Sequence, residues 1–346
     1  MTLELKRRLK SLASFAARRT GVNACCRRQL RKRLLVLCYH SIIHDELEID
    51  EYRRRDATRR SEFGAQLDII KKYFKPISAS DLIEHLREMK SLPEYPVLIT
   101  FDDGYRNNLE HALPELMVRN VPAIVHVTTG HIGAERLLWV HELDERVISW
   151  PYRQIPVPNS EAEMLLPNCP LERMRIADRF RSQCKRLPLE KRDRFLDRLR
   201  IVKLALDERI SNSLYAFLTW DEVRELDSHG IAIGAHTIDH PILTSIDNTE
   251  LRRQLSVSKH TVEAELAKDC PCLAYTNGGR ADFSPEVVAM AREVGFKCAF
   301  VVVGRPNHPE LQSFEIDRVP IPGKLSSDEF TSRLHGWRTY LDTFGG

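Results

Sequence analysis

A short apolar run that ends in two adjacent carboxylates constrains this 346-residue chain more than any other stretch. The sequence Val97-Leu98-Ile99-Thr100-Phe101-Asp102-Asp103-Gly104 is typical of a buried strand that is closed by a turn. Neighbouring side chains at a strand end point in different directions, so Asp102 and Asp103 can serve different partners. Two carboxylates this close are costly unless a cation or a proton offsets them. The pair therefore predicts either a charged functional site or an Asp-Asp-Gly turn that caps the next helix.

Strand-length apolar runs alternate with amphipathic helical patterns along most of the chain. A helix is expected from Asp81 to about Met89, with Ser80 as its N-cap. Alternating strands and helices indicate parallel βαβ units and an α/β fold. Strands are expected at 34–40, 97–102, 122–127, 231–236, 273–275 and 297–303, with helices that include 61–74, 106–119 and 249–267.

Charge and hydrophobic patterning divide the chain into several parts. Residues 34–323 form the main α/β domain, and a charged helical insertion rich in Arg, Asp, Glu and Leu interrupts it at about 150–215. A C-terminal tail or helix follows at 324–346. The basic segment 1–33 interleaves leucines with arginines and lysines at partly helical spacing. This segment predicts either peripheral contact with an anionic membrane surface or a solvated helix packed against the domain.

Bulk composition excludes several classes of protein. A formal net charge of +3 is too small to indicate nucleic-acid binding by the whole chain. The eight cysteines contain no CxxC pair and do not have the spacing of a zinc ribbon. No run approaches the length of a membrane span, and residues 1–33 lack the apolar core of a signal peptide. These features predict a cytoplasmic protein, with the inner membrane face as a peripheral alternative.

A second motif, His236-Thr237-Ile238-Asp239-His240-Pro241, follows another expected strand. Two histidines four residues apart can converge on one ion. The carboxyl ends of parallel strands lie on one face, so Asp103, His236 and His240 are expected to form a two-His, one-carboxylate metal site. Such a site suits Zn²⁺ first, with Co²⁺, Ni²⁺ or Fe²⁺ as alternatives. Asp102 is then placed to accept a proton from a water at the metal.

Together the two motifs resemble those of the polysaccharide deacetylases of the NodB-homology type, carbohydrate esterase family 4. The resemblance covers roughly residues 34–323. It implies a distorted (β/α)7 barrel and metal-dependent removal of acetyl groups from N-acetylated sugars. By matching motifs it implies Asp102 as the general base and Asp103, His236 and His240 as metal ligands.

The general acid is less well defined, because the late Leu-x-x-His motif of the family has no clean match. Tyr39-His40 resembles the opening of one branch of the family, and His40 is a candidate for the acid or for a positioning partner. His335 is a weaker alternative, because it lies beyond the last expected strand. The bland alternative for His40 is a hydrogen bond to a neighbouring backbone group.

The third motif also departs from the family, which usually has Tyr-Pro-x-Gly where this chain has Tyr275-Thr276-Asn277-Gly278. Trp139 is a candidate sugar-stacking platform, although core packing is the commoner role of tryptophan. A backbone N–H after the strand could still bind the oxyanion. By the resemblance, substrate-binding roles fall on Tyr275, Asn277, Gly278 and Arg280.

The sequence therefore predicts a metal-dependent carbohydrate N-deacetylase that acts on a polysaccharide or on a lipid-linked glycan precursor. Two alternatives are a catalytically impaired carbohydrate- or partner-binding protein on the same barrel, and an amidohydrolase of non-sugar C–N bonds.

Overall fold

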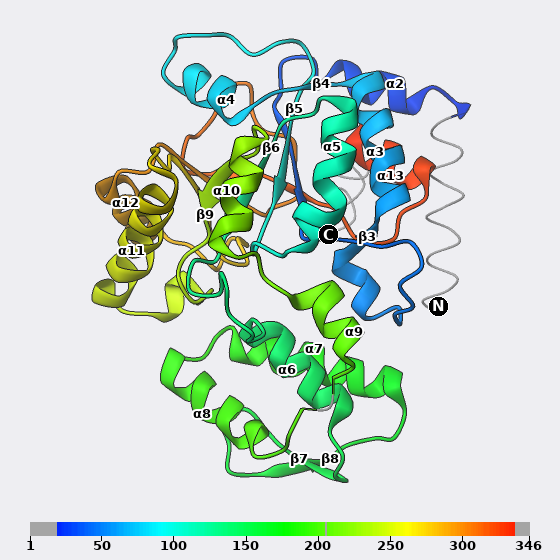
Figure 1. Cartoon of the computed structure of the whole chain (residues 1–346), viewed down its shortest axis with the longest axis vertical. Coiled ribbons are helices and arrows are strands. Elements are labelled where there is room, and N and C mark those ends of the chain that lie inside the picture. The colour runs from blue at the N-terminus through cyan, green and yellow to red at the C-terminus, as the bar shows by residue number, and fades with distance from the viewer. Residues whose placement is uncertain (1–18, 205, 336–346) are drawn as a thin grey trace.

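A parallel sheet rolled into a nearly closed barrel forms the centre of the molecule, of which the computed structural model describes residues 19–204 and 206–335 (Figure 1). The sheet order is β12-β11-β10-β9-β6-β5-β1-β13, with β4 beside β5. The predicted α/β barrel is confirmed. Its strands are β1 (Leu35–Tyr39), β4 (Lys75–Pro76), β5 (Pro96–Phe101), β6 (Ala123–Val127), β9 (Ala232–Ala235), β10 (Cys272–Ala274), β11 (Cys298–Val301), β12 (Ile316–Asp317) and β13 (Val319–Pro320).

A single short segment joins the two edges of the sheet. β12 pairs with β11, whereas β13 pairs with β1, where Leu37 lies opposite Val319. Arg318 is the one residue between β12 and β13. Counted as one bent strand, β12 and β13 give the barrel the seven positions that the sequence predicts, apart from the short β4. Arg318 therefore occupies the seam at which the barrel closes.

Alternating residues of each strand face two different cores, as the pleat of a strand requires. Leu37, Ile99 and Val125 belong to the larger core, which also contains apolar residues of the surrounding helices. Their neighbours Leu98 and Ile124 belong to a smaller core, together with residues of β10, β11 and β12. Because this smaller core contains strand residues from around the barrel, it fills the barrel interior. Any polar residue of the same parity near a strand end must then project into the barrel.

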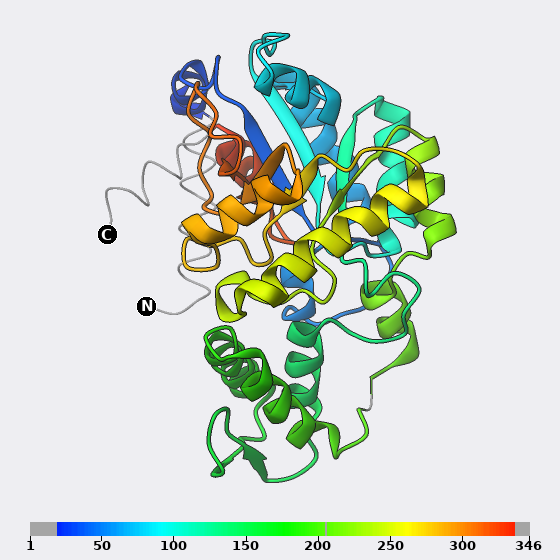
Figure 2. The same ribbon diagram turned by 90° about the vertical axis from the view of Figure 1, so that its left-hand side faces the viewer.

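Helices surround the barrel, as two perpendicular views show (Figures 1 and 2). Helix α4 corrects the prediction of its N-cap. Ser78, not Ser80, is the N-cap of α4, because its hydroxyl accepts from the Asp81 N–H at 3.1 Å and the Asp81 carboxylate accepts from the Ser78 N–H at 2.9 Å. The helices are α2 (Val22–Arg28), α3 (Arg60–Tyr73), α4 (Ala79–Leu86), η2 (Asn108–Ala112), α5 (Leu113–Arg119), α10 (Trp220–Ser228), α11 (Asn248–Leu266), α12 (Pro285–Val294) and α13 (Ser327–Leu334).

A separate lobe lies beyond one end of the barrel, at the bottom of Figures 1 and 2. It has a hydrophobic core of its own, built mainly from α6, α7 and α8, with Phe180 and Phe195 in edge-to-face contact. The lobe and its connections contain α6 (Trp139–Ser149), β7 (Gln154–Pro156), β8 (Glu163–Leu165), α7 (Pro170–Cys184), α8 (Leu189–Arg200), α9 (Glu208–Ile210) and η3 (Ser211–Tyr215). Short elements elsewhere are β2 (Ser41–Ile43), η1 (Arg53–Asp56), β3 (Ala57–Arg59) and η4 (Leu243–Ser245).

Most of the predicted basic amphipathic segment at 1–33 lies outside the described residues. Its described part contains α2, in which Arg27 donates a hydrogen bond to the Tyr73 carbonyl at 3.1 Å. In the described part of the chain, no helix combines the length and the apolar character that crossing a bilayer requires. All eight cysteines are described, and each is a free thiol.

The C-terminal end of α13 packs against α3 through a buried histidine. The His335 ring contacts Tyr73 edge-on at 5.2 Å and stacks on Phe74 at 6.0 Å, and neither ring nitrogen has a hydrogen-bond partner. Burial, reinforced by the Arg27 charge, lowers the pKa of His335 to about 4. His335 is therefore a neutral packing residue and not the general acid.

Replacing His335 by Phe should weaken the dependence of stability on pH. The folded-state pKa of His335 lies below its unfolded value of about 6.5, so the unfolded chain binds the proton first and stability falls as the pH drops below that value. Between about pH 6.5 and 5 this residue alone accounts for a loss of about 2 kcal/mol. The free energy of unfolding, measured with urea near pH 7 and near pH 5, should therefore fall by about 2 kcal/mol less in His335→Phe than in the wild type. The exposed His260 offers a matched control, His260→Gln, and an unchanged slope in His335→Phe would contradict the assignment.

Candidate metal centre and active site

The two adjacent carboxylates diverge because the strand ends just before them and the backbone turns at Asp103. β5 ends at Phe101, so Asp102 keeps the inward parity of Leu98. Asp103 adopts a left-handed backbone conformation with φ 77°, and Gly104 follows with φ 86°. A Cβ at Gly104 would lie 3.1–3.2 Å from the side chains of Ile132 and Val127. The glycine therefore permits both the turn and the close packing that separate the two carboxylates.

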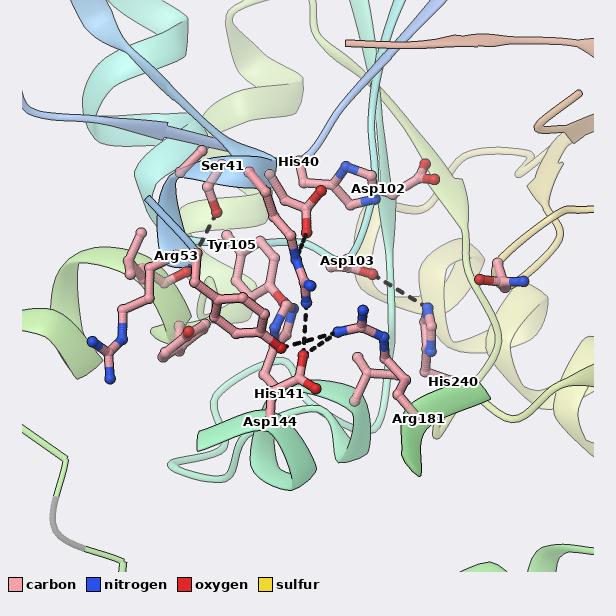
Figure 3. A pocket seen from close by; sticks show the side chains of 18 of the residues that line it. His40, Ser41, Arg53, Asp102, Asp103, Tyr105, His141, Asp144, Arg181 and His240 are labelled. Atoms are coloured by element: carbon pink, nitrogen blue, oxygen red, sulfur yellow. Dashed lines mark hydrogen bonds and ion pairs between the residues drawn. The ribbon is translucent and has the colours of Figure 1, made fainter. Parts of the chain in front are cut away.

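Asp103, His236 and His240 converge on one point from two distant segments. Figure 3 shows Asp103 and His240 facing each other. The Oδ1 atom of Asp103 lies 3.5 Å from Nε2 of His236 and 3.5 Å from Nε2 of His240. All three side chains are buried. His240, like Asp103, has a left-handed backbone, with φ 55°. The structure thus brings together the three residues that the sequence predicts as ligands.

The donor atoms fit a divalent cation. The Nδ1–H of His236 donates to the Ala274 carbonyl at 2.8 Å, which leaves the Nε2 lone pair facing Asp103. Oδ1 of Asp103 is buried without a hydrogen-bond partner. Burial lowers the pKa of His236 to about 4, so its imidazole is neutral and able to ligate. Burial also raises the pKa of Asp103 to about 7, a cost that a bound cation would remove.

Asp102 is held by the arginine at the barrel seam. Arg318 donates to both carboxylate oxygens, with Nη1–Oδ1 at 2.6 Å and Nη2–Oδ2 at 2.7 Å, and its side chain is fully buried. Burial by itself raises the pKa of Asp102, but the Arg318 charge, together with His236 and the side chain of His126, outweighs it and holds the pKa well below its usual range. The pair therefore keeps a buried carboxylate ionised beside Asp103, His236 and His240. These three residues are called the metal cluster below.

A histidine inside the barrel supports the same carboxylate. His126 Nδ1 lies 3.2 Å from Asp102 Oδ1, and burial lowers the pKa of His126. The His126 ring occupies the space beside Gly234, where an added Cβ would approach its Cδ2 to 2.5 Å. The glycine in β9 thus marks the close approach of this ring.

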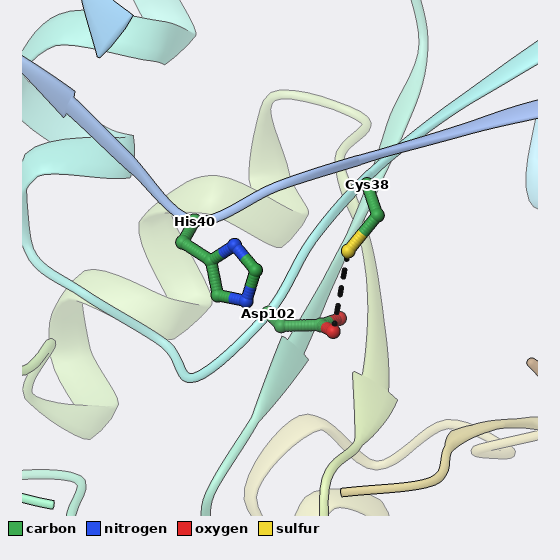
Figure 4. A group of neighbouring side chains, drawn as sticks. All are labelled: Cys38, His40 and Asp102. Carbon is green, nitrogen blue, oxygen red and sulfur yellow. Dashed lines mark hydrogen bonds between the residues drawn. The ribbon is translucent and has the colours of Figure 1, made fainter. Parts of the chain in front are cut away.

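His40 lies next to Asp102. One nitrogen of His40, the Cys38 thiol and one oxygen of Asp102 lie within 4.8 Å of one another (Figure 4). These atom types could hold a metal, but both oxygens of Asp102 already accept from Arg318, whose charge would oppose a second cation. The arrangement suits proton transfer at Asp102 and His40 better than a second metal.

A cavity of about 370 Å³ opens onto these groups, and the inserted lobe supplies one of its walls (Figure 3). Of the four residues predicted to bind substrate, Asn277 lines this cavity. Tyr275 is fully buried and stacks on Phe283, while exposed Arg280 borders a different surface depression and Gly278 packs against Val302. None of these three lines the cavity. Tyr275 keeps the outward parity of Leu273 in β10, and Gly278 and Arg280 belong to the loop that follows the strand. The cavity is lined on its other sides mainly by His40, Ser41, Tyr52, Arg53, Arg55, Asp56, Tyr105, His141, Asp144, Arg181, Lys185 and Tyr215.

Trp139, at the start of α6, joins the inserted lobe to the metal cluster. Its indole Nε1–H donates to the His240 carbonyl at 2.9 Å, and its ring is buried beneath the Arg192 guanidinium at 4.7 Å. Trp139 is therefore too buried to stack on a sugar. Its hydrogen bond instead holds the peptide of His240, a candidate metal ligand whose backbone is in a strained conformation.

Comparison with known proteins agrees with the geometry. The family model described as polysaccharide deacetylase matches residues 90–299, which is more than half of the chain. The chain belongs to the polysaccharide deacetylase family. A search of curated protein sequences finds no match.

Several solved structures share the fold of this family member. The Streptococcus pyogenes deacetylase PplD in complex with acetate has a TM-score of 0.57 at 14% identity, covering 87% of this chain and 98% of that one. A de-N-acetylase from Aggregatibacter actinomycetemcomitans has a TM-score of 0.54 at 16% identity, covering 87% and 99%. IcaB from Ammonifex degensii has a TM-score of 0.54 at 18% identity, covering 88% and 96%. At these identities the comparison establishes the shared barrel.

Sequence reasoning did not assign a role to Arg318, to His126 or to the inserted lobe. Arg318 did leave a signal, because it is a lone cation in the alternating stretch Ile316-Asp317-Arg318-Val319-Pro320-Ile321. Such a residue at an inward position of a strand needs a buried counter-charge. Nothing local to residues 139–185 indicates that they reach the metal cluster.

Replacing Trp139 by Phe should weaken metal binding by about tenfold, because the loss of one supporting hydrogen bond loosens the His240 peptide. Competition with a chromogenic chelator measures the affinity, and the Co²⁺ absorption spectrum reports the ligand geometry. Trp150→Phe is a matched control, since the buried Trp150 Nε1–H donates to the Gln154 carbonyl within the lobe. Equal affinities in the two variants would contradict the role of Trp139.

Replacing Arg318 by Met should lower the free energy of unfolding by about 3–5 kcal/mol, because it leaves the buried Asp102 charge unpaired. In the double variant Asp102→Asn/Arg318→Met no charge remains at the pair, so its loss should be smaller than the sum of the two single losses. Urea unfolding of all four proteins gives this coupling energy. Strict additivity would show that the two residues do not depend on each other.

Proposed function

We propose that this protein is a metal-dependent hydrolase that removes acetyl groups from N-acetylated sugars of a polysaccharide or a glycan precursor. The observation that carries the proposal is the convergence of Asp103, His236 and His240 on one point, with ionised Asp102 beside it. Family membership supports the reaction class, and the cavity gives a substrate access to these groups.

A divalent ion held by Asp103, His236 and His240 would polarise the acetamide carbonyl and lower the pKa of an attacking water. Asp102 accepts the proton of that water as general base, and the pair with Arg318 keeps its carboxylate charged and fixed in direction. His126 restrains the same carboxylate from the barrel interior. The base is therefore organised before substrate binds.

His40 is the side chain best placed to protonate the departing amine. It lines the cavity beside Asp102, whereas His335 packs against α3. The Asn108 side chain donates to the His40 carbonyl at 2.8 Å, which fixes the backbone at this strand end. In this assignment Asp102 takes up one proton and His40 delivers another, and the two side chains are neighbours in one cavity.

Zn²⁺ is the metal that we propose first, since two neutral imidazoles and one carboxylate suit it in hydrolytic sites. The same donors accept Co²⁺, Ni²⁺ or Fe²⁺. Elemental analysis of the purified protein, followed by chelation and reconstitution with each ion, identifies the ion that restores acetate release.

The binding-protein alternative predicts a bound metal without acetate release. The buried ion pair of Asp102 with Arg318 favours the enzyme over the binding protein. Metal binding alone requires only Asp103, His236 and His240, and a buried ion pair that served no further purpose would be costly to keep. The amidohydrolase alternative is tested by including non-sugar acetamides among the substrates. Release of acetate from these alone would replace the proposed substrate class.

Changing Asp102 to Asn should reduce acetate release from N-acetylated glycans by about 100-fold or more, because the general base is lost. Metal content should stay the same, since Asp102 is not one of the three candidate ligands. Acetate released from chitin oligosaccharides, poly-N-acetylglucosamine and peptidoglycan fragments measures the activity. Asp197→Asn, at an exposed position of α8, is the matched control, and undiminished activity in Asp102→Asn would overturn the assignment of the base.

A lipid-linked precursor at the inner membrane face, reached through residues 1–33, remains a prediction of the sequence. Residues 1–18 lie outside the described structure, and the part in α2 packs on α3 through Arg27. Binding of the full chain to vesicles with and without anionic lipid tests this part of the proposal.

A further inference from the structure

The inserted lobe places a cation in the cavity wall close to the metal cluster. Lys185 follows directly after α7, is half-buried and lines the cavity together with Arg181, one helical turn earlier. Its ammonium donates to the Asn277 side-chain carbonyl across the cavity rim.

Lys185 differs from the other cations of the cavity in having no carboxylate partner. Arg55 and Arg181 both pair with Asp144, and Arg53 pairs with Glu145. In the described part of the chain no carboxylate oxygen lies within ion-pair distance of the Lys185 ammonium. An ammonium group offers three N–H donors, and the Asn277 contact uses one of them. Two donors therefore remain, and no carboxylate among the described residues is in ion-pair contact with the charge.

The carboxylates that line the cavity are largely engaged. Asp102 is paired with Arg318, Asp103 belongs to the metal cluster, and Asp144 is shared by two arginines. Asp56 contacts Arg55 at 3.1 Å. A divalent ion at the metal cluster would add further positive charge to this end of the cavity. Partly buried charge without a counter-charge is costly, so an anion here would be stabilised.

We propose that Lys185 binds an anionic substituent, a carboxylate or a phosphate, carried by the N-acetylated sugar or by the sugar next to it. This inference rests on the proposed function and narrows its substrate class to acidic glycans. Lys185 is then a specificity-determining residue that the inserted lobe contributes. The alternative is a structural tether, in which Lys185 only fixes Asn277 to the lobe.

Calorimetric titration of the metal-loaded and the metal-free protein separates these roles. The probes are N-acetylglucosamine, N-acetylglucosamine 6-phosphate, N-acetylmuramic acid and inorganic phosphate. We expect at least one of the two acidic sugars to bind about tenfold or more tightly than the neutral one, the size of a charge-assisted hydrogen bond. The phosphate and carboxylate arms identify the anion. Because binding is measured without catalysis, the result stands apart from acetate release.

The variant Lys185→Met should remove most of that preference, so that acidic and neutral sugars bind with similar affinity. Lys185→Arg should keep it, and Lys191→Met, at an exposed position of α8, is the matched control. Anions that simply coordinate the metal would bind Lys185→Met as tightly as the wild type. That result, an equal loss for neutral and acidic sugars, or no binding of either acidic sugar at millimolar concentration would overturn the proposal.

Discussion

The buried ion pair between Arg318 and Asp102 is the interaction on which the architecture and the chemistry both depend. Arg318 lies where β12 passes into β13, so the residue that closes the sheet also supplies the positive charge that pairs with Asp102. Removing either partner leaves a charge in a medium that solvates it poorly. The pair favours the closed barrel over any partly open sheet, because only closure brings residues 102 and 318 together. An ionised Asp102 is thus a by-product of completing the fold.

The inserted lobe is part of the site, not an appendage. Trp139 holds the peptide of His240, and Lys185 reaches Asn277 across the cavity. Both contacts join the lobe to loops at the carboxyl ends of barrel strands, where this architecture collects its chemistry. The barrel supplies a metal cluster and a base, while the lobe shapes what can approach them.

Much of the site could be predicted because its residues follow directly from strand ends. Asp103, His236 and His240 stand in compact motifs, and parallel strands place such ends on one face. Arg318 and Lys185 could not be assigned, because their partners lie more than 90 residues away and depend on closure and docking. The N-cap of α4 failed for a local reason: Ser78 and Ser80 are equally good caps, and Asp81 at the third helical position selects Ser78.

The position of Arg318 also sets an order of events. A chain synthesised from its N-terminus exposes residues 103, 236 and 240 long before residue 318 leaves the ribosome. A nascent chain can therefore assemble its metal ligands while the neighbouring carboxylate still lacks its guanidinium and β1 still lacks its last neighbour. The ion pair of Asp102 with Arg318 is therefore completed only with the final strand, after all three residues of the candidate metal site have been synthesised.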